Sequence, residues 1–500
     1  MNKPTTPKTN EAMLYQLLAE QIEQNRVLRE QLQQLQHQLA TLQSMIFGQK
    51  SERKRKPLDD SPTTINTPPA AIPTTNAVSP SKADTKNGRR QLPDDLERIK
   101  IRHDLPEDKK HCPCCASKLQ CIGKDVSEQL DFIPAKLIAK EHIRYKYACQ
   151  RCRQYMVTAP MPEQPIDKGL AGSGLLAEIL INKYEDALPL YRQQQRWARL
   201  GYELPRSTLC DWVMQCAERL KPIVDAMAKS CLYPARKLHT DDTPFPILAN
   251  GKTHTGRLWV YVGQADNASP CTIYQYSKTR AQSVPGKFLE NYQGYLQADA
   301  YPGYDKLYQS GRITEVACFA HARRKFMDIV KSVKEPTLAN CAIEMIGQLY
   351  AIEKKSKSMT VLQRYFYRRR FARPILKTLY RWLIEQNKIA PPKTPLGMAI
   401  QYMLNHWKAL NNYLLDGILD IDNNRAERAI KPFVIGRKNF LFAGSHRGAE
   451  MAAVIYSLIA SCKMLDINTF DYFKDVLQRL PTTLNQNISD LFPCYWKPSA

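Results

Sequence analysis

No uninterrupted apolar stretch in this 500-residue chain approaches the ~18 residues that would suggest a membrane-spanning helix. The opening residues, MNKPTTPKTN, are polar and lack the apolar segment of a secretory signal peptide. We therefore expect a protein of the cytoplasm with no membrane partner. In that compartment the 14 cysteines should be reduced thiols, some of them metal ligands, rather than disulfides.

Acidic residues are few relative to basic ones. The chain has 48 Asp and Glu against 72 Lys and Arg, which gives a formal net charge of +24 and a pI near 9.4. Such a balance favours polyanionic partners, nucleic acids above all. The alternative is solubilising charge with basic tails, but the excess of basic residues continues well beyond the ends. The length allows about two to four domains, each with its own core.

The N-terminal part of the chain has the pattern of a coiled coil followed by a linker. Residues 11–48 carry two interleaved seven-residue series of mostly apolar positions, which predicts a leucine-zipper-like coiled coil and a homo-oligomer. Asn25 lies at a core position, where a polar residue fixes register and oligomer state. A single amphipathic helix packed on its own domain is the alternative. Residues 49–94 have the composition of a disordered linker.

Residues 95–165 are predicted to form a zinc-ribbon-like, DNA-binding domain. They contain two Cys-x-x-Cys pairs, with strand-like sequence rich in Ile, Tyr and Phe between them. Four thiolates from two such pairs can surround a structural Zn²⁺ tetrahedrally. Four buried or redox-active cysteines are the alternative, and Cys114 and Cys121 are spare thiols that complicate the assignment. The predicted zinc ligands are Cys112, Cys115, Cys149 and Cys152.

Residues 166–230 are predicted to be helical and to include a helix-turn-helix. In the segment ARLGYELPRSTLCDW, a first helix would run to Leu200, Gly201 would permit the turn, and Ser207 would cap the second helix. If the second helix enters the major groove, side chains at its N-terminal end contact DNA. An ordinary helical pair within a bundle fits the sequence equally well. The candidate DNA-binding residues are Arg206, Ser207 and Thr208, with Asp211 beside them.

From residue 231 the pattern changes to alternating strands and helices. In residues 231–327, three strand-like segments, a helix and a fourth strand precede another strand that leads into a helix. This is the order of the ribonuclease H-like fold, in which the first and fourth strands lie side by side. Residues 328–418 are helical and basic, which predicts an all-helical insertion. Residues 419–480 resume the core and 481–500 form a C-terminal tail, so the predicted fold class is multidomain α/β.

Three acidic segments stand out in this basic sequence, around Asp241 in HTDDTP, Asp299 in LQADAYPGYD and Glu427 in IDNNRAER. The first two are expected to end strands and the third to open a helix. Adjacent first and fourth strands would bring Asp241 and Asp299 within reach of a shared metal. Carboxylates are hard ligands suited to Mg²⁺ or Mn²⁺, and two such ions can cleave and rejoin phosphodiester bonds. The sequence thus predicts a two-metal site with these three residues as catalytic ligands.

Several residues near these acids have two interpretations. Strand alternation sends Asp241 and Asp242 to opposite faces, so only one of the two should reach the metals. Asn424 and Glu427 fit a capping box, a structural role that can coexist with metal ligation. His321, in CFAHARRKF, fits either a group that contacts substrate or orders a carboxylate, or a satisfied core histidine.

Two further basic segments are candidates for DNA contact. Arg437 and Lys438 in GRKNF suit phosphates, with Phe440 and Phe442 beside them for base stacking, although a core strand with exposed basic positions fits equally well. The helical insertion contains a dense basic run that suits phosphate contacts or a plain solvated face. Its members are Arg368, Arg369, Arg370 and Arg373.

The sequence resembles bacterial transposases of the insertion sequence sixty-six family, which belong to the DDE transposases. The likeness extends from the heptads to the C-terminus, and its most specific blocks are FGQKSER, HCPCCASKL, NKYEDALPLYRQ, HTDDTPFPIL, LQADAYPGYD and IDNNRAERAIKPFVIGRKNFLFAGSHRGAE. The family pattern places its two aspartates on Asp241 and Asp299, its glutamate on Glu427 and its zinc knuckle on the four cysteines named above. Members usually have Asp-Glu-Thr where this chain has Asp241-Asp242-Thr243, a departure that leaves the triad intact.

The resemblance implies a transposase that binds the terminal inverted repeats of its own element in double-stranded DNA. It would free 3′-OH ends and transfer them to target DNA with two Mg²⁺ or Mn²⁺ ions. The coiled coil would pair protomers, and small accessory proteins encoded by the same element are candidate partners. The expected location is the bacterial cytoplasm, in association with the nucleoid. The alternative is a non-enzymatic, sequence-specific DNA-binding regulator built on the zinc ribbon, helix-turn-helix and coiled coil.

Overall fold

The computed structural model describes residues 136–148, 156–167, 169–249, 251–263, 270–332 and 337–499, together with the isolated helical positions Gln21, Gln24, Arg26 and Gln31. Contacts between residues divide the chain into two units, Met1–Glu52 with Ile143–Ala500 and Arg53–His142. All helices and strands named below belong to the first unit. The predicted linker and the four predicted zinc ligands lie outside the described residues, as does nearly all of the predicted coiled coil.

A five-stranded sheet forms the centre of the described fold. Its strands, in chain order, are β3 (Lys237–Ala249), β4 (Lys252–Gly263), β5 (Cys271–Ser277), β6 (Gly294–Ala298) and β7 (Ile313–Ala317). Their order across the sheet is β5-β4-β3-β6-β7. The pairs β3–β4 and β4–β5 are antiparallel, whereas β6 is parallel to both β3 and β7. The first and fourth strands of this series therefore lie side by side, as the sequence predicts.

The register of β3 and β6 determines where the first two acids lie. Leu238 is level with Leu296, and His239 is level with Gln297. The same offset, continued for two residues, sets Asp241 level with Asp299. Asp299 follows the last residue of β6, as expected, but Asp241 lies within β3, which continues for eight further residues paired to β4. The prediction that the first strand ends at Asp241 is therefore wrong.

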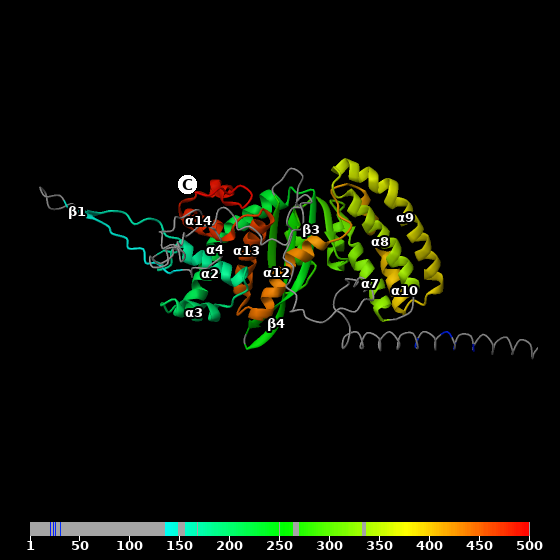
Figure 1. Cartoon of the computed structure of the whole chain (residues 1–500), viewed down its shortest axis with the longest axis horizontal. Coiled ribbons are helices and arrows are strands. Elements are labelled where there is room, and N and C mark those ends of the chain that lie inside the picture. The colour runs from blue at the N-terminus through cyan, green and yellow to red at the C-terminus, as the bar shows by residue number, and fades with distance from the viewer. Residues whose placement is uncertain are drawn as a thin grey trace, which may run out of the picture. The chain divides into compact units, whose positions relative to one another are not determined.

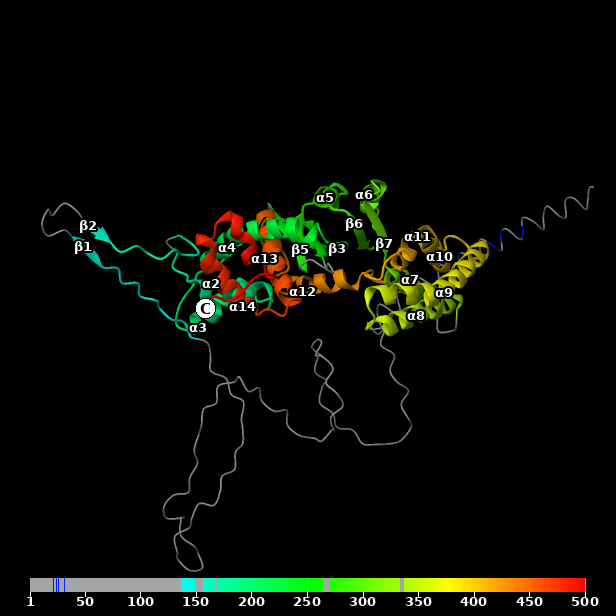
Figure 2. The same ribbon diagram turned by 90° about the horizontal axis from the view of Figure 1, so that it is seen from above.

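Helices cover both faces of the sheet, and β4 is therefore buried on both faces from Leu258 onward. On one face, α12 (Asn424–Phe440) packs against β3 and β4, and α13 (His446–Met464) packs against β5. Phe245 of β3 contacts Phe433 of α12 on this face. On the other face, Tyr261 of β4 stacks on Phe288 of α5 (Ser283–Phe288). Figures 1 and 2 show α12 lying along the sheet.

A helical group lies beyond β5. It consists of α2 (Ser173–Tyr184), α3 (Leu190–Arg199), α4 (Arg206–Met227) and α14 (Thr469–Arg479), packed around α13. Two buried serines join α13 to the sheet: Ser457 and Ser461 accept hydrogen bonds from the backbone N–H groups of Tyr274 and Thr272, at 2.8 and 3.0 Å.

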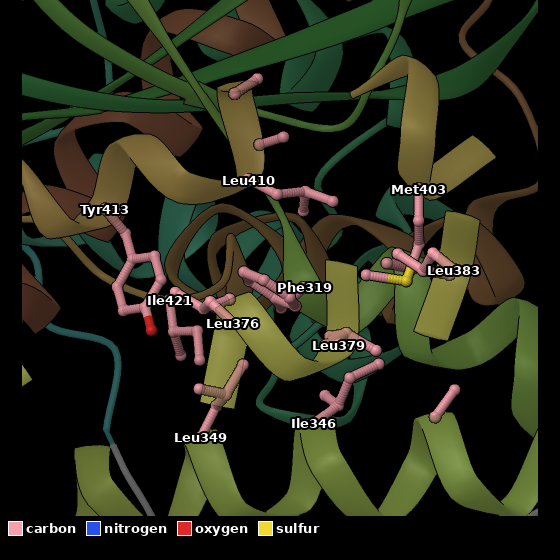
Figure 3. Close-up of a cluster of buried hydrophobic side chains, with 14 of the residues drawn as sticks. Phe319, Ile346, Leu349, Leu376, Leu379, Leu383, Met403, Leu410, Tyr413 and Ile421 are labelled. Atoms are coloured by element: carbon pink, nitrogen blue, oxygen red, sulfur yellow. The ribbon is translucent and has the colours of Figure 1, made fainter. Parts of the chain in front are cut away.

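A second helical group lies beyond β7 and follows from the basic segment predicted to be an insertion. It contains α7 (Phe319–Ser332), α8 (Leu338–Ser356), α9 (Val361–Ile389), α10 (Pro395–Asn405) and α11 (Trp407–Asn411). Leucines and isoleucines at helical spacing form its own apolar core, with Phe319 in the middle of the cluster (Figure 3). The predicted helical character of this segment is confirmed.

Shorter elements complete the described fold. None of the described helices has the length and apolar character needed to span a membrane. The short elements are β1 (Lys146–Ala148), β2 (Met156–Thr158), the π-helix η2 (Ala228–Leu232), η3 (Pro302–Tyr304), α6 (Asp305–Gln309), η4 (Asn412–Leu414), η5 (Leu480–Thr482) and η6 (Asn485–Leu491).

Candidate active site

Three carboxylates from distant parts of the chain converge where α12 crosses the sheet. Asp241 projects from β3 toward the α12 face, Asp299 leaves the carboxyl end of β6, and Glu427 lies in the first turn of α12. Burial raises the pKa of Asp241 to about 7, and the charges of Asp299, Asp242 and Glu427 act in the same direction. Mutual repulsion of this kind requires that the acids lie close together. The site therefore concentrates negative charge in a partly desolvated place.

Asp299 and Glu427 share a histidine neighbour. Burial raises the pKa of Asp299, while the nearby charges of His321 and Arg280 moderate the rise. His321 Nε2 lies 3.9 Å from Glu427 Oε1, and Arg324 Nη2 lies 3.7 Å from the same oxygen. Neither His321 Nδ1 nor Glu427 Oε1 has a hydrogen-bond partner, although both atoms are buried. His321 thus lies beside Glu427 with Nδ1 unsatisfied, which is unusual for a core histidine.

Asp242 faces the opposite side of the sheet and is neutralised there. Its carboxylate accepts hydrogen bonds from Arg280 at 2.7 and 2.9 Å and from Arg257 at 3.1 Å, and its side chain is only 2% exposed. The guanidinium of Arg280 also lies 4.0 Å from Asp299 and stacks over the ring of Tyr301. Strand alternation thus separates the two neighbouring aspartates as predicted, with Asp241 as the one nearest Glu427.

The segment that leads into α12 is held to the sheet by buried polar contacts. Asp420 accepts from Lys237 at 2.9 Å, lies 3.1 Å from His239 Nε2, and accepts from Arg425 at 3.0 Å. Burial alone would favour the neutral acid, but these partners lower the pKa of Asp420, so it remains ionised. Gln297 of β6 donates to the carbonyl oxygens of Asp420 and Asp422. These contacts fix the start of α12 and hence the position of Glu427.

Asn423, not Asn424, precedes the first turn of α12, and its side chain makes no cap hydrogen bond. Its amide instead donates to the carbonyl of Thr240 at 2.8 Å, and its Oδ1 lies 3.0 Å from His239 Nδ1. Asn424 donates to Asp422 at 2.7 Å. The predicted capping box between Asn424 and Glu427 is therefore absent, and the carboxylate of Glu427 is left available to the site.

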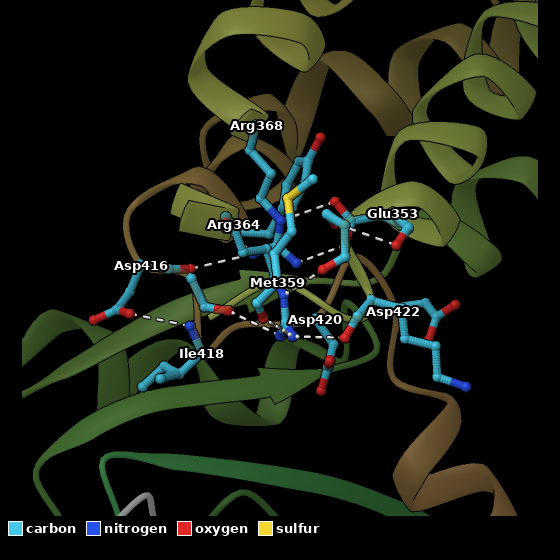
Figure 4. Close-up of polar contacts among 12 residues, drawn as sticks. Glu353, Met359, Arg364, Arg368, Asp416, Ile418, Asp420 and Asp422 are labelled. Atoms are coloured by element: carbon cyan, nitrogen blue, oxygen red, sulfur yellow. Dashed lines mark hydrogen bonds and ion pairs between the residues drawn. The ribbon is translucent and has the colours of Figure 1, made fainter. Parts of the chain in front are cut away.

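The same entry segment is joined to the helical group by two arginines of α9 (Figure 4). Arg368 is 1% exposed, forms a bidentate pair with Glu353 of α8, and donates to the carbonyls of Tyr413 and Asp416. Arg364 donates to the carbonyl of Gly417 at 3.2 Å. The interpretation of Arg368 as a phosphate contact is therefore wrong, because its side chain is buried and fully paired.

The three carboxylates fit a divalent cation by their chemistry and by their unsatisfied state. A cation would stabilise the charged form of Asp241, whose pKa burial and its acidic neighbours raise, and Glu427 Oε1 is buried without a hydrogen-bond partner. Within the described residues, no three His, Cys, Asp or Glu side chains are gathered closely enough to enclose an ion by themselves. The acids thus converge more loosely than ligands around a bound metal.

The predicted helix-turn-helix segment forms a helical pair. α3 ends at Arg199, and Gly201 has a φ of +92°, as a tight turn requires. Ser207 is not the cap, because α4 begins at Arg206 after Pro205 and has no side-chain cap hydrogen bond. Arg206 and Ser207 are exposed at the N-terminal end of α4, and Thr208 is half-buried.

The GRKNF segment is the last part of α12, not a strand. Arg437 donates to the carbonyl of Pro244 and so joins α12 to β3, whereas Lys438 is exposed. Phe440 packs against Phe245 and Phe433 and is thus part of the apolar face of α12. Phe442 is 41% exposed.

Comparison with known proteins places the chain among the transposases. It belongs to the family described as Transposase IS66 family, which matches residues 168–451. Residues 109–153, which include all four predicted zinc ligands, match the zinc-finger binding domain of transposase IS66. Residues 34–101 match a segment described as Transposase C of IS166 homeodomain, and residues 457–494 match the IS66 C-terminal element. Family membership implies that the substrate is DNA, and the zinc-finger match supports a structural zinc.

Relatives from Sinorhizobium fredii (strain NBRC 101917 / NGR234) extend over most of the chain. Uncharacterized protein y4hP is 32% identical over 494 residues, which cover 93% of this chain and 88% of the relative. Uncharacterized protein y4jD is 32% identical over 421 residues, with 81% of each chain covered. The family match over residues 168–451 spans the sheet, the second helical group and the positions of the three acids.

The structure adds site residues that the sequence does not reveal. Arg280 follows β5 in the segment SKTRAQS, which carries no recognisable motif. His239 and Gln297 lie two residues before Asp241 and Asp299, on the same strand faces, so alternation alone marks them as neighbours of the site. Asp420 stands beside Asp422 in a turn-like segment, and only its three basic partners distinguish it.

Proposed function

We propose that the chain is an active DDE transposase that binds the terminal inverted repeats of its element, cuts each end to free a 3′-OH, and joins that end to target DNA. The observation that carries the proposal is the convergence of Asp241, Asp299 and Glu427, with the pKa of Asp241 raised to about 7 by burial and by its acidic neighbours. Perturbed acids of this kind concentrate at functional sites. The strand order β5-β4-β3-β6-β7 supports a ribonuclease H-like core.

Asp241, Asp299 and Glu427 would together hold Mg²⁺ or Mn²⁺, and a pair of such ions supplies both activation of the attacking oxygen and stabilisation of the leaving oxygen. The sheet contributes rigidity, because Asp241 lies on a strand paired to β4 and Asp299 directly follows a strand paired on both sides. Burial lowers the pKa of His321, which favours its neutral form, and its Nε2 lies 3.9 Å from Glu427 Oε1. Arg280 and Arg324 border the acids and attract a phosphodiester backbone toward them.

The remaining parts are assigned to DNA recognition and assembly. The zinc-binding segment with Cys112, Cys115, Cys149 and Cys152 and the exposed N-terminal end of α4 would contact the terminal repeats. Lys438 would add a phosphate contact from the end of α12. The heptads of residues 11–48 would pair protomers so that two element ends meet, and accessory proteins of the element are candidate partners in that complex.

The test is cleavage and joining of labelled element ends by the purified full chain with Mg²⁺ and a target plasmid. Asp299→Asn is expected to lower end cleavage by about 10³-fold or more while end binding stays nearly unchanged. Asp305→Asn is the matched control, because Asp305 is an exposed aspartate six residues further on, in α6. Undiminished cleavage by Asp299→Asn would remove the catalytic assignment of the three carboxylates, whereas no cleavage by the unaltered chain would leave a DNA-binding regulator.

A further inference from the structure

A basic groove lies on the second helical group, away from the three carboxylates. It has a volume of about 620 Å³ and is formed by one side of α9 together with α11. α9 runs along the edge of that helical group in Figures 1 and 2. The lining side chains that carry charge or rings are Arg369, Arg373, Lys377, Tyr380 and Trp407, with Asn411 at the α11 side.

Nearly all the charged residues of α9 are basic. The 29 residues of α9 include eight Arg or Lys and a single acid, Glu385, in the last turn. Arg369, Arg373 and Lys377 follow one another at intervals of four residues, so they form a row with a rise of ~6 Å between neighbours. Arg373 and Lys377 are exposed and make no ion pair or hydrogen bond with any described residue. Arg369 donates to the hydroxyl of Tyr365 but forms no ion pair with a described residue. A row of cations without acidic partners suits a polyanionic strand.

Aromatic rings lie at one end of the cationic row. Tyr380 of α9 and Trp407 of α11 have ring centroids 5.1 Å apart at an interplanar angle of 31°. Tyr380 is 40% exposed, and the backbone under Trp407 is fixed by a hydrogen bond from Asn411 to its carbonyl oxygen at 2.7 Å. Trp407 is half-buried and supports the more exposed ring of Tyr380. An exposed ring on a rigid support is a platform on which a nucleic-acid base can stack.

We propose that this groove binds an unpaired DNA strand, with phosphates along Arg369, Arg373 and Lys377 and a base stacked on the Tyr380–Trp407 pair. The bases of a duplex are stacked inside it, so its phosphates would contact the cations but its bases would not reach the rings. An unpaired strand would contact both. The proposal rests on the proposed function in one respect, that DNA is the substrate. It adds a site for strand ends or melted segments, separate from the three carboxylates.

The first experiment compares two double variants of the full chain. Arg373→Gln with Lys377→Gln removes two groove cations, and Arg381→Gln with Lys388→Gln removes the same two residue types from exposed positions of α9 outside the groove. Binding of a labelled 20-nucleotide single strand is measured by fluorescence anisotropy over a series of salt concentrations. The groove variant should lower the slope of log K against log salt by about 1.4, because each phosphate contact contributes roughly 0.7. The control variant should keep the full slope.

The second experiment tests the aromatic platform. Tyr380→Leu should weaken single-strand binding about fivefold or more, with blunt-duplex binding unchanged. A single strand that carries 5-iodouracil should crosslink to Tyr380 or Trp407 on irradiation, as read by mass spectrometry. Three results would overturn the proposed single-strand site. They are equal losses in both double variants, a duplex affinity that falls as much as the single-strand affinity, and crosslinks confined to other parts of the chain.

These outcomes are separable from those of the catalytic test, because binding is measured without added divalent cation. If the groove variant binds single strands normally while Asp299→Asn fails to cleave, only the groove is lost. If the groove behaves as expected and Asp299→Asn cleaves normally, only the catalytic assignment is lost.

Discussion

Asp241 is the residue whose surroundings depart most from those of an ordinary surface aspartate. It is partly buried, faces two other acids, and has no basic side chain paired with it, whereas Asp242 next to it has two arginines. The pairing of β3 with β4 determines this difference by turning the two side chains to opposite faces. A bare sequence cannot choose between the two, since both follow the same apolar run. The choice comes from the register, or from resemblance to a family.

The raised pKa of Asp241 predicts a stability effect with a definite sign. The folded pKa of about 7 exceeds the unfolded value of ~3.9, so between these pH values the folded chain binds the extra proton. Folding stability should therefore fall as pH rises from about 4 to about 7. Asp241→Asn removes this penalty and should stabilise the metal-free protein by about 2–4 kcal/mol at pH 8, with the gain nearly absent at pH 4.

Urea unfolding at the two pH values checks this prediction, with Asp242→Asn as the neighbouring control. That control should be destabilised at pH 8, because it leaves Arg257 and Arg280 without their carboxylate. A gain for Asp241→Asn that is equal at pH 4 and pH 8 would contradict the assigned cause.

At the scale of elements, most strands and helices were predictable because burial imposes their periodicity. β4, β5, β6 and β7 appear in the sequence as apolar runs of strand length, and β7 leads into α7 as expected. β3 is longer than predicted because Pro244 and Pro246 suggest a turn. β6 pairs with β3 only as far as His239. Beyond that residue one edge of β3 needs no continuous series of N–H donors, and both prolines are therefore tolerated.

The start of α12 shows why capping rules failed at the site. Local sequence favours Asn424 as a cap with Glu427 as its partner. Tertiary partners compete more strongly, because His239 and the carbonyl of Thr240 engage Asn423 while Asp422 engages Asn424. No sequence pattern contains those long-range contacts, which join residues more than 180 positions apart.

The buried pair between α8 and α9 supplies a prediction at this scale. Arg368→Met leaves the carboxylate of Glu353 without its bidentate partner and should destabilise the protein by about 3–5 kcal/mol. Adding Glu353→Met to the same chain should recover much of that loss, because no uncompensated charge remains. Thermal unfolding of the two variants measures the difference, and a double variant as unstable as the single one would argue against a charge effect.

At the scale of the whole molecule, the basic chain combines several segments of different structural type. The central sheet and α12 carry the three carboxylates, and the family matches place a zinc-finger segment at residues 109–153 and a leucine-zipper-type segment before it. Charge and cysteine spacing suffice to predict this division, since each depends on composition or on local spacing. Strand order predicts the approach of Asp241 to Asp299, whereas the long-range contacts that position Glu427 are visible only in the fold.

Removal of the zinc ligands tests the assignment of the N-terminal metal. Purified protein should contain about one Zn²⁺ per chain, and Cys112→Ser should reduce it to near zero with a large loss of end binding. Cys210→Ser is the control, because Cys210 is an exposed free thiol in α4. Zinc content is read by elemental analysis, and a Cys112→Ser protein that keeps its full zinc content would show that other ligands hold the metal.

The fold holds the three acids with different rigidity. Asp241 lies on β3 and Asp299 directly follows the adjoining strand β6, so the sheet fixes their spacing. Glu427 lies on α12, and the segment before α12 accepts backbone hydrogen bonds from Arg364 and Arg368 of α9. Loosening the contacts of Arg364 and Arg368 with this segment, as Arg368→Met does, should therefore disturb the position of Glu427 more than the spacing of the two aspartates.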